Sequence, residues 1–291
     1  MSIPDAIERA KKLYGQRNSG NLKRPDPQRA VADDTASLAA LREQLIAHDV
    51  QQAPEPVALE NLDHDLAACE RNNILVTEAQ LMQAGHAAAT IRLLRGRVLQ
   101  RTRANGWSCI GITSAGPGEG KTVTSLNLAI SIAREKQRMV YLLDLDMRSP
   151  SVCERTGLKP PRPLSQYFTD NLEPHEVLFR AITDNLVVAG NLRPVASASE
   201  LLATPRLQNL LDYIRRRSPG ALIVLDLPPV LSTDEALVVA PRADAMFLVV
   251  AEGITRRDGL ARAVDILSDF TVAGIIMNRS SEPLGSDYYG Y

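Results

Sequence analysis

Residues 115–122 (AGPGEGKT) have the types and spacing of a loop that holds phosphate. The alternating glycines let the backbone wrap so that successive N–H groups point at one anion, and a following helix would add its positive end. The segment lies between an expected strand and an expected helix, which is the setting this motif requires. Lys121 would reach the β- and γ-phosphates and Thr122 would give its hydroxyl to Mg²⁺. The predicted nucleotide-binding residues of the loop are Gly116, Gly118, Glu119, Gly120, Lys121 and Thr122.

Three aspartates stand at the ends of two apolar runs further along the chain. Asp144 and Asp146 close VYLLDLD, and on an extended backbone two residues that are two positions apart project to the same side. Two carboxylates held together repel unless a cation or a shared proton stabilises them. Asp226 lies next to the last residue of ALIVLDL, where a carboxylate can hold a magnesium-bound water. One alternative is a strand end that merely turns polar.

Together these motifs predict a site with one cation, one lysine and three acids around a triphosphate. The residues expected to form this site are Lys121, Thr122 and the three aspartates. Those parts suffice for phosphoryl transfer, because that chemistry is mostly positioning and charge neutralisation. The acceptor of the phosphoryl group must be sought elsewhere in the chain.

Three of the seven tyrosines, Tyr288, Tyr289 and Tyr291, fall in the last four positions. Residues 281–291 have no apolar periodicity, so we expect a flexible tail. The tail could dock on a partner, or it could carry hydroxyl acceptors on a tether. From Asn278 to the tyrosines is about ten residues, at most about 35 Å when extended, so a neighbouring subunit's site is within reach.

The elements that must position these residues follow an alternating pattern. Apolar runs of strand length alternate with helical stretches, and the hydrophobicity of the runs is continuous, which indicates a parallel sheet covered on both faces. The expected fold class is therefore α/β, with a mostly parallel sheet of the P-loop kind and ligands at the carboxyl ends of the strands. Strands are predicted at 107–113, 139–146, 186–190, 221–227, 245–251 and 273–278, and helices near 121–135, 205–217, 233–240 and 257–268.

The amino-terminal part differs in texture. We expect short helices at 1–13 and 35–47 separated by a polar linker at 15–34, and a longer helix over 76–103 that carries a stripe of arginines. The stripe is either a solvated helix face or a subunit contact. The predicted domains are a helical, partly disordered region at 1–75, a P-loop domain at 76–280 and the tail at 281–291.

Composition sets broad limits. The 291 residues include 33 basic and 34 acidic side chains, so no global field draws the chain toward nucleic acid. Cys69, Cys109 and Cys153 lack paired spacing, which favours buried free thiols in a reducing compartment. No apolar run is long enough for a membrane span and the amino terminus is charged, so the expected location is the cytoplasm.

The segments SAGPGEGKT, LLDLDMRSP and IVLDLPPVLSTDEAL, with the tyrosine-rich end, closely resemble the bacterial tyrosine autokinases (BY-kinases) of capsule and exopolysaccharide synthesis. The resemblance covers about residues 60–291. It implies that Lys121 and Thr122 bind ATP and Mg²⁺, that Asp144 and Asp146 serve the metal and deprotonate the tyrosine, and that Asp226 completes the metal site. It leaves open which of the first two aspartates is the base. It also implies adenine contact at Asn278 and autophosphorylation of the three tail tyrosines.

One motif departs from the family pattern. The ring-forming motif of the family reads Glu, two residues, Arg, two residues, Arg, and here Arg92 and Arg95 are present but Ala89 replaces the glutamate. The resemblance implies a homo-oligomer with both arginines at the interface, weakened or altered by the missing ion pair.

The expected function is a tyrosine autokinase that acts mainly between subunits and regulates polysaccharide polymerisation and export. Expected partners are a membrane-embedded polysaccharide chain-length regulator that recruits the protein to the inner face of the plasma membrane, and a tyrosine phosphatase, but no nucleic acid. One alternative is a partition-type ATPase switch, whose members usually carry a lysine where this chain has Gly116. Another is a nucleotide-binding regulator without kinase activity, which the missing glutamate would suit.

Overall fold

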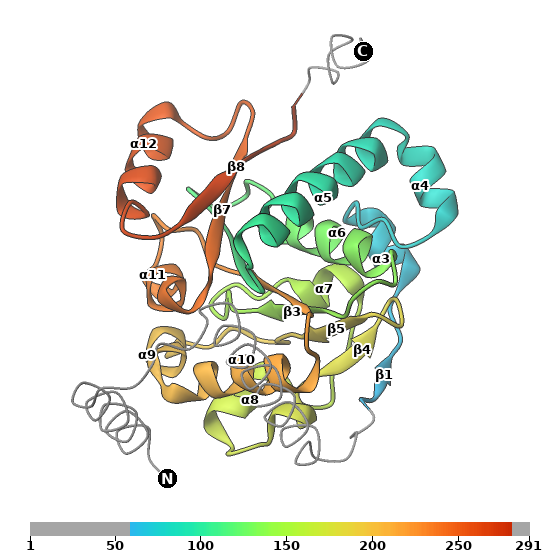
Figure 1. Cartoon of the computed structure of the whole chain (residues 1–291), viewed down its shortest axis with the longest axis vertical. Helices are drawn as coiled ribbons and strands as arrows, with labels where there is room; N and C mark the ends of the chain where they lie inside the picture. The colour runs from blue at the N-terminus through green and yellow to red at the C-terminus, as the bar shows by residue number, and fades with distance from the viewer. Residues whose placement is uncertain (1–58, 281–291) are drawn as a thin grey trace, which may run out of the picture. The chain divides into compact units, whose positions relative to one another are not determined.

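The computed structural model describes residues 59–280, which belong to one compact unit (Figure 1). Several expectations fall outside the described residues: the helices at 1–13 and 35–47, the linker at 15–34, and the tail with Tyr288, Tyr289 and Tyr291.

A mostly parallel sheet of eight strands, within the described range, forms the centre of the unit. All neighbouring strands run parallel except β4 and β5, which are antiparallel. The predicted fold class is therefore confirmed. In spatial order the strands are β1 (Asn61–Leu62), β4 (Phe179–Ala181), β5 (Leu186–Ala189), β3 (Val140–Asp144), β6 (Leu222–Asp226), β2 (Cys109–Ser114), β7 (Ala245–Ala251) and β8 (Val272–Asn278).

Helices cover both faces of the sheet and enclose two apolar cores, because successive residues of each buried strand point to opposite faces. Leu142 of β3 packs with the helices on one face, and Leu143 packs with those on the other. The first face holds α3 (Leu66–Arg71), α5 (His86–Asn105), α6 (Lys121–Ala133) and α7 (Val152–Thr156). The second holds α8 (Leu164–Thr169), α9 (Ala198–Ala203), α10 (Pro205–Arg217), α11 (Glu235–Val239) and α12 (Arg257–Ile266), with short 3₁₀ turns at η1 (Pro174–Glu176) and η2 (Ala240–Arg242).

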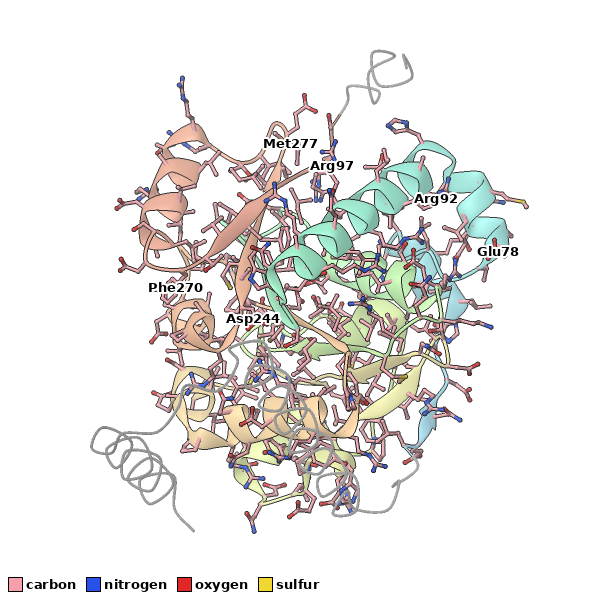
Figure 2. All side chains as sticks on the ribbon, in the orientation of Figure 1. Glu78, Arg92, Arg97, Asp244, Phe270 and Met277 are labelled. Atoms are coloured by element: carbon pink, nitrogen blue, oxygen red, sulfur yellow. The ribbon has the colours of Figure 1, made fainter. Side chains whose placement is uncertain are left out.

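The helix expected over 76–103 is two helices. Gly85, with φ of +37°, separates α4 (Glu78–Ala84) from α5, and α4 begins with a capping box between Thr77 and Gln80. Figure 2 shows Arg92 and Arg97 projecting from α5. Among residues 59–280, no helix combines the length and the apolar character that crossing a bilayer would need.

A segment that we placed in the amino-terminal region packs against the sheet unit. Asp65 caps α3 through its side chain, its backbone N–H donates to Thr156 O (2.9 Å), and Cys69 and Ile74 are fully buried. Gly157 makes this contact possible, since a Cβ there would lie 2.4 Å from Asp65 Cβ. The core on this face therefore includes residues from before position 76.

All three cysteines are buried free thiols, as predicted. Burial raises the pKa of Cys69 to about 11 and those of Cys109 and Cys153 to about 12. Because the thiolate is the reactive form, N-ethylmaleimide at about pH 8 should modify none of them in the native chain and all three in guanidinium. Mass spectrometry of the intact protein checks this. Modification without denaturant would contradict the buried placement.

Candidate active site

The phosphate loop joins β2 to α6 in the shape that anion binding requires. Gly118 and Gly120 have φ of +77° and +93°, a region that favours glycine, and a Cβ on Gly120 would lie 2.0 Å from Asn278 Nδ2. α6 begins at Lys121, and no side chain of the described residues caps its first turn. The N–H groups of that turn therefore remain available to a phosphate, together with the positive end of the helix.

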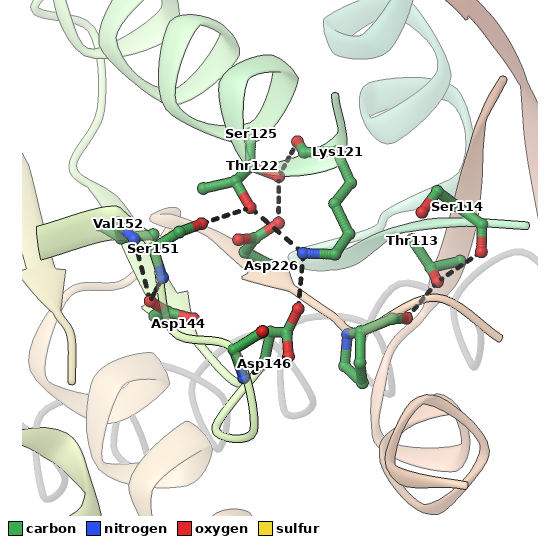
Figure 3. Close-up of polar contacts among 12 residues, drawn as sticks. Thr113, Ser114, Lys121, Thr122, Ser125, Asp144, Asp146, Ser151, Val152 and Asp226 are labelled. Atoms are coloured by element: carbon green, nitrogen blue, oxygen red, sulfur yellow. Dashed lines mark hydrogen bonds and ion pairs between the residues drawn. The ribbon is translucent and has the colours of Figure 1, made fainter. Parts of the chain in front are cut away.

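Lys121 and Asp146 form a buried ion pair at the mouth of the loop (Figure 3). The ammonium Nζ lies 2.6 Å from Asp146 Oδ2, and the two side chains are 12% and 4% exposed. Burial lowers the pKa of Lys121, but the charges of Asp226 and Asp146 outweigh it and raise the pKa above its ordinary value. The lysine is therefore held as a cation, with Thr122 Oγ1 as a second acceptor at 3.2 Å.

Asp144 and Asp226 are paired residues of neighbouring strands, so the sheet places the two carboxylates side by side. Both are fully buried. Asp144 Oδ2 accepts from the N–H groups of Ser151 and Val152 at 3.1 Å each, and Asp226 Oδ1 accepts from Ser125 Oγ at 3.0 Å. Among residues 59–280, their remaining oxygens, Asp144 Oδ1 and Asp226 Oδ2, find no hydrogen-bond partner.

Burial raises the pKa of both carboxyl groups, and in Asp144 the charge of Asp226 raises it further. Such a pair needs a proton or a cation. No group of three His, Cys, Asp or Glu side chains suited to a metal occurs in residues 59–280. A Mg²⁺ ion would therefore take its other ligands from Thr122, phosphate oxygens or water, which are the oxygen ligands it prefers. The residues present fit a magnesium nucleotide.

Asp144 and Asp146 face different partners, although the strand pattern suggested one common side. β3 ends at Asp144, and Asp146 lies in the turn beyond it, where its other oxygen accepts from Ser149 N (3.1 Å). Asp146 lines the open cleft, whereas Asp144 lies beneath it against the start of α7. The end of the regular strand therefore separates the two carboxylates.

The cleft over these residues has a volume of about 1110 Å³. It runs from the phosphate loop to a wall with Arg71, Arg155 and Lys159. Small-molecule sites usually occupy about 300–1,000 Å³, so there is room for an acceptor group beside a nucleotide.

The predicted interface arginines lie on α5, outside this cleft. Arg95 Nε is 2.9 Å from Glu135 Oε1, and its Nη1 donates to Ser131 O at 3.2 Å. Arg92 borders a cavity of about 70 Å³ between α5 and α6. Glu135 thus gives Arg95 an acidic partner within the same chain, and the interface role of both arginines stays a prediction.

Several residues at the site were not singled out from the sequence. The hydroxyl of Ser151 donates to Thr122 Oγ1 at 3.1 Å, and Ser125 contacts Asp226. Arg148 forms an ion pair with the buried Glu235 at the edge of the cleft. Arg148 and Glu235 both stand inside the recognised motifs, but no local pattern pairs residues so far apart in sequence.

The buried carboxylates make a stability prediction. Asp144→Asn should raise the free energy of unfolding of the nucleotide-free protein by roughly 1 kcal/mol or more, because it removes a charge that the folded state disfavours. In the unfolded chain the Asp144 carboxyl loses its proton above about pH 4, while in the folded chain it keeps the proton to higher pH. As pH rises between these two pKa values, the stability of the wild type falls, and the stability gained by Asp144→Asn grows. Urea unfolding at several pH values measures it.

Asp258→Asn is the matched control, because Asp258 is exposed and Arg256 lowers its pKa through a hydrogen bond. It should give no gain. An Asp144→Asn protein that is less stable than wild type at neutral pH would contradict the account of the carboxylate pair.

Several known proteins are similar to this chain. Comparison with models of protein families finds no match. Tyrosine-protein kinase YwqD of Bacillus subtilis is 26% identical over 226 residues, which cover 76% of this chain and 91% of YwqD. A putative tyrosine-protein kinase, EpsB of Ralstonia solanacearum, is 32% identical over 160 residues, or 55% of this chain and 21% of EpsB. The solved kinase domain of VpsO superposes with a TM-score of 0.61 at 25% identity, covering 69% of this chain and 98% of that domain.

The chain thus spans nearly all of YwqD and of the VpsO kinase domain, and about a fifth of EpsB. The chain is therefore similar to bacterial tyrosine-protein kinases over most of its length.

Proposed function

We propose that this protein-tyrosine kinase transfers the γ-phosphoryl group of ATP to Tyr288, Tyr289 and Tyr291 of its own chain, mainly between subunits. The observation that carries the proposal is the arrangement of one buried ammonium and three carboxylates at the mouth of a phosphate loop. A cationic group there binds a triphosphate, and the carboxylates can hold a metal and accept a proton.

In the proposed reaction, separate residues bind the phosphates, hold the metal and accept the proton. The loop N–H groups and Lys121 bind the β- and γ-phosphates, which requires Lys121 to exchange Asp146 for phosphate oxygens. Thr122, Asp146 and Asp226 hold Mg²⁺, which neutralises phosphate charge when bound. Asp144 or Asp146 takes the phenol proton as the oxygen attacks the γ-phosphorus and the bond from that phosphorus to the bridging oxygen breaks, which leaves ADP and phosphotyrosine.

The position of the last described residues before the tail supports the choice of the tail tyrosines as acceptors. Asn278 ends β8 and its side chain donates to Glu119 O at 2.9 Å, so the last described residues lie at the phosphate loop. About ten residues separate Asn278 from the first tail tyrosine, a length of at most about 35 Å. The tyrosine hydroxyl groups could therefore reach the phosphate loop of this subunit or of a neighbour. The side-chain amide of Asn278 donates to the phosphate loop here. Contact between Asn278 and adenine therefore stays a prediction.

The proposed consequence is regulation of an assembly. Each phosphate adds about −1.5 to −2 charges, so phosphorylated tails on adjacent subunits would repel one another and loosen the oligomer. We place this cycle in the cytoplasm, at the inner face of the plasma membrane, under a membrane-embedded chain-length regulator that activates the kinase and a phosphatase that resets it. The cycle would then control polymerisation and export of a capsule or exopolysaccharide.

Autophosphorylation is the first test. The purified full chain, incubated with ATP and Mg²⁺ alone and with a candidate membrane activator, should carry phosphate on the tail tyrosines by peptide mass spectrometry. Lys121→Met should lower labelling by at least about 100-fold, because the triphosphate loses its cationic partner. Hydrolysis of ATP with no phosphotyrosine under either condition would favour an ATPase switch, and labelling that survives Lys121→Met would indicate a contaminating kinase.

A mixing experiment tests transfer between subunits. The acceptor is a full chain with Lys121→Met, and the donor is a full chain with all three tail tyrosines changed to Phe, so neither can label itself at the tail. We expect phosphate on the acceptor. An acceptor that carries both sets of changes is the control and should stay unlabelled. If the mixed acceptor stays unlabelled while wild-type protein labels itself, transfer occurs within one chain.

A further inference from the structure

The phosphate loop is bound from its outer side by residues of the carboxy-terminal part of the chain. The Thr255 hydroxyl, in the loop between β7 and α12, donates to Glu119 Oε1 at 2.7 Å. The same hydroxyl oxygen accepts from the backbone N–H of Ala251 at 2.9 Å. Because the Ala251 N–H can only donate, the direction of both bonds is determined, and the single hydroxyl proton is committed to Glu119.

The side chain of Glu119 links Thr255 to Ala115, the first residue of the loop. Its second carboxylate oxygen, Oε2, accepts from Ala115 N at 2.9 Å, and the residue is only 4% exposed. Both oxygens of the carboxylate are therefore used by the protein. A nucleotide could still contact the backbone N–H of Glu119, but its side chain supports the loop.

Two more hydrogen bonds are made to backbone carbonyl groups of the loop. Arg279 Nη2 donates to Gly118 O at 3.0 Å, and Asn278 Nδ2 donates to Glu119 O at 2.9 Å. Arg279 adopts the left-handed conformation, with φ of +56°, which is uncommon for a residue with a side chain. When carbonyl groups of such a loop are bound on the outside, the N–H groups can stay directed at the space that a phosphate fills.

We infer that Thr255, acting through Glu119, is a positioning residue for nucleotide binding, and that Arg279 supports the same loop from the end of β8. This inference rests on the proposed nucleotide site and extends it to residues more than 130 positions from the loop. A loop that is ordered before the nucleotide arrives avoids an entropic cost on binding. Without the Thr255 hydroxyl, the Ala251 N–H and Glu119 Oε1 would both lose a partner.

The test compares Thr255→Val with Thr255→Ser in the full chain. Valine keeps the shape and removes both hydrogen bonds, while serine keeps the hydroxyl. With a fluorescent ATP analogue and Mg²⁺, we expect the Kd to rise about tenfold in the valine variant and to stay within about twofold of wild type in the serine variant. In the kinase assay the KM for ATP should rise by a similar factor, with kcat at saturating ATP within about threefold.

Two further variants keep the test decisive. Thr90→Val is the matched control, because within the described part of the chain its hydroxyl bonds only to His86 O in α5, and it should leave the Kd unchanged. Arg279→Ala alters an exposed side chain, so the protein should fold, and its Kd should rise several-fold. If Thr255→Val does not fold, Thr255→Ala, which also removes both hydrogen bonds, takes its place in the comparison with Thr255→Ser.

Each outcome has one meaning. A Kd for Thr255→Val equal to that of wild type would overturn the inference, and so would a Thr255→Ser variant that binds as weakly as the valine variant. An Arg279→Ala variant that binds as tightly as wild type would overturn its part. If the wild-type chain itself fails to bind the analogue, the proposed function fails instead, so the two failures are distinguishable.

Discussion

The pairing of β3 with β6 is the constraint on which the site depends. It sets Asp144 opposite Asp226 in register, so two carboxylates meet inside the protein where water cannot screen them. Lys121 lies at the start of α6, and the charges of Asp226 and Asp146 raise its pKa and keep it charged. Charge at this point is therefore unbalanced until a metal ion or a proton arrives, and an incoming magnesium nucleotide would supply the missing cation together with a new partner for the lysine.

Such a site costs stability, and the surrounding fold offsets that cost. The two apolar cores on either face of the sheet hold the strand ends rigidly, so the carboxylates cannot move apart to relieve their repulsion. The phosphate loop is held in the same way from its outer side by Thr255, Asn278 and Arg279. Rigid elements thus support a strained centre, which is a common arrangement where binding and catalysis need preset geometry.

Long, continuous apolar runs made the strand positions predictable. The six runs named from the sequence correspond to β2, β3, β5, β6, β7 and β8. The first five are buried along their whole length, whereas β8 leaves Ile275 and Met277 exposed. β1 and β4 have only two and three residues, too few for any pattern. The helix break at Gly85 could not be predicted for another reason. An isolated glycine is tolerated inside helices, but here Gly85 is the C-cap of α4 and the N-cap of α5.

The sequence alone determined which residue types make up the candidate site, because the loop and each aspartate are encoded by short segments whose residue types have direct physical meaning. It also indicated the parallel sheet, since crossover helices between buried strands leave few other arrangements. Only the tertiary structure decided which groups face one another: that Asp146 meets Lys121 while Asp144 meets Asp226, that Arg95 finds Glu135, and that Thr255 reaches Glu119. Those contacts join residues far apart in the chain, and their partners depend on strand order and register, which local periodicity does not encode.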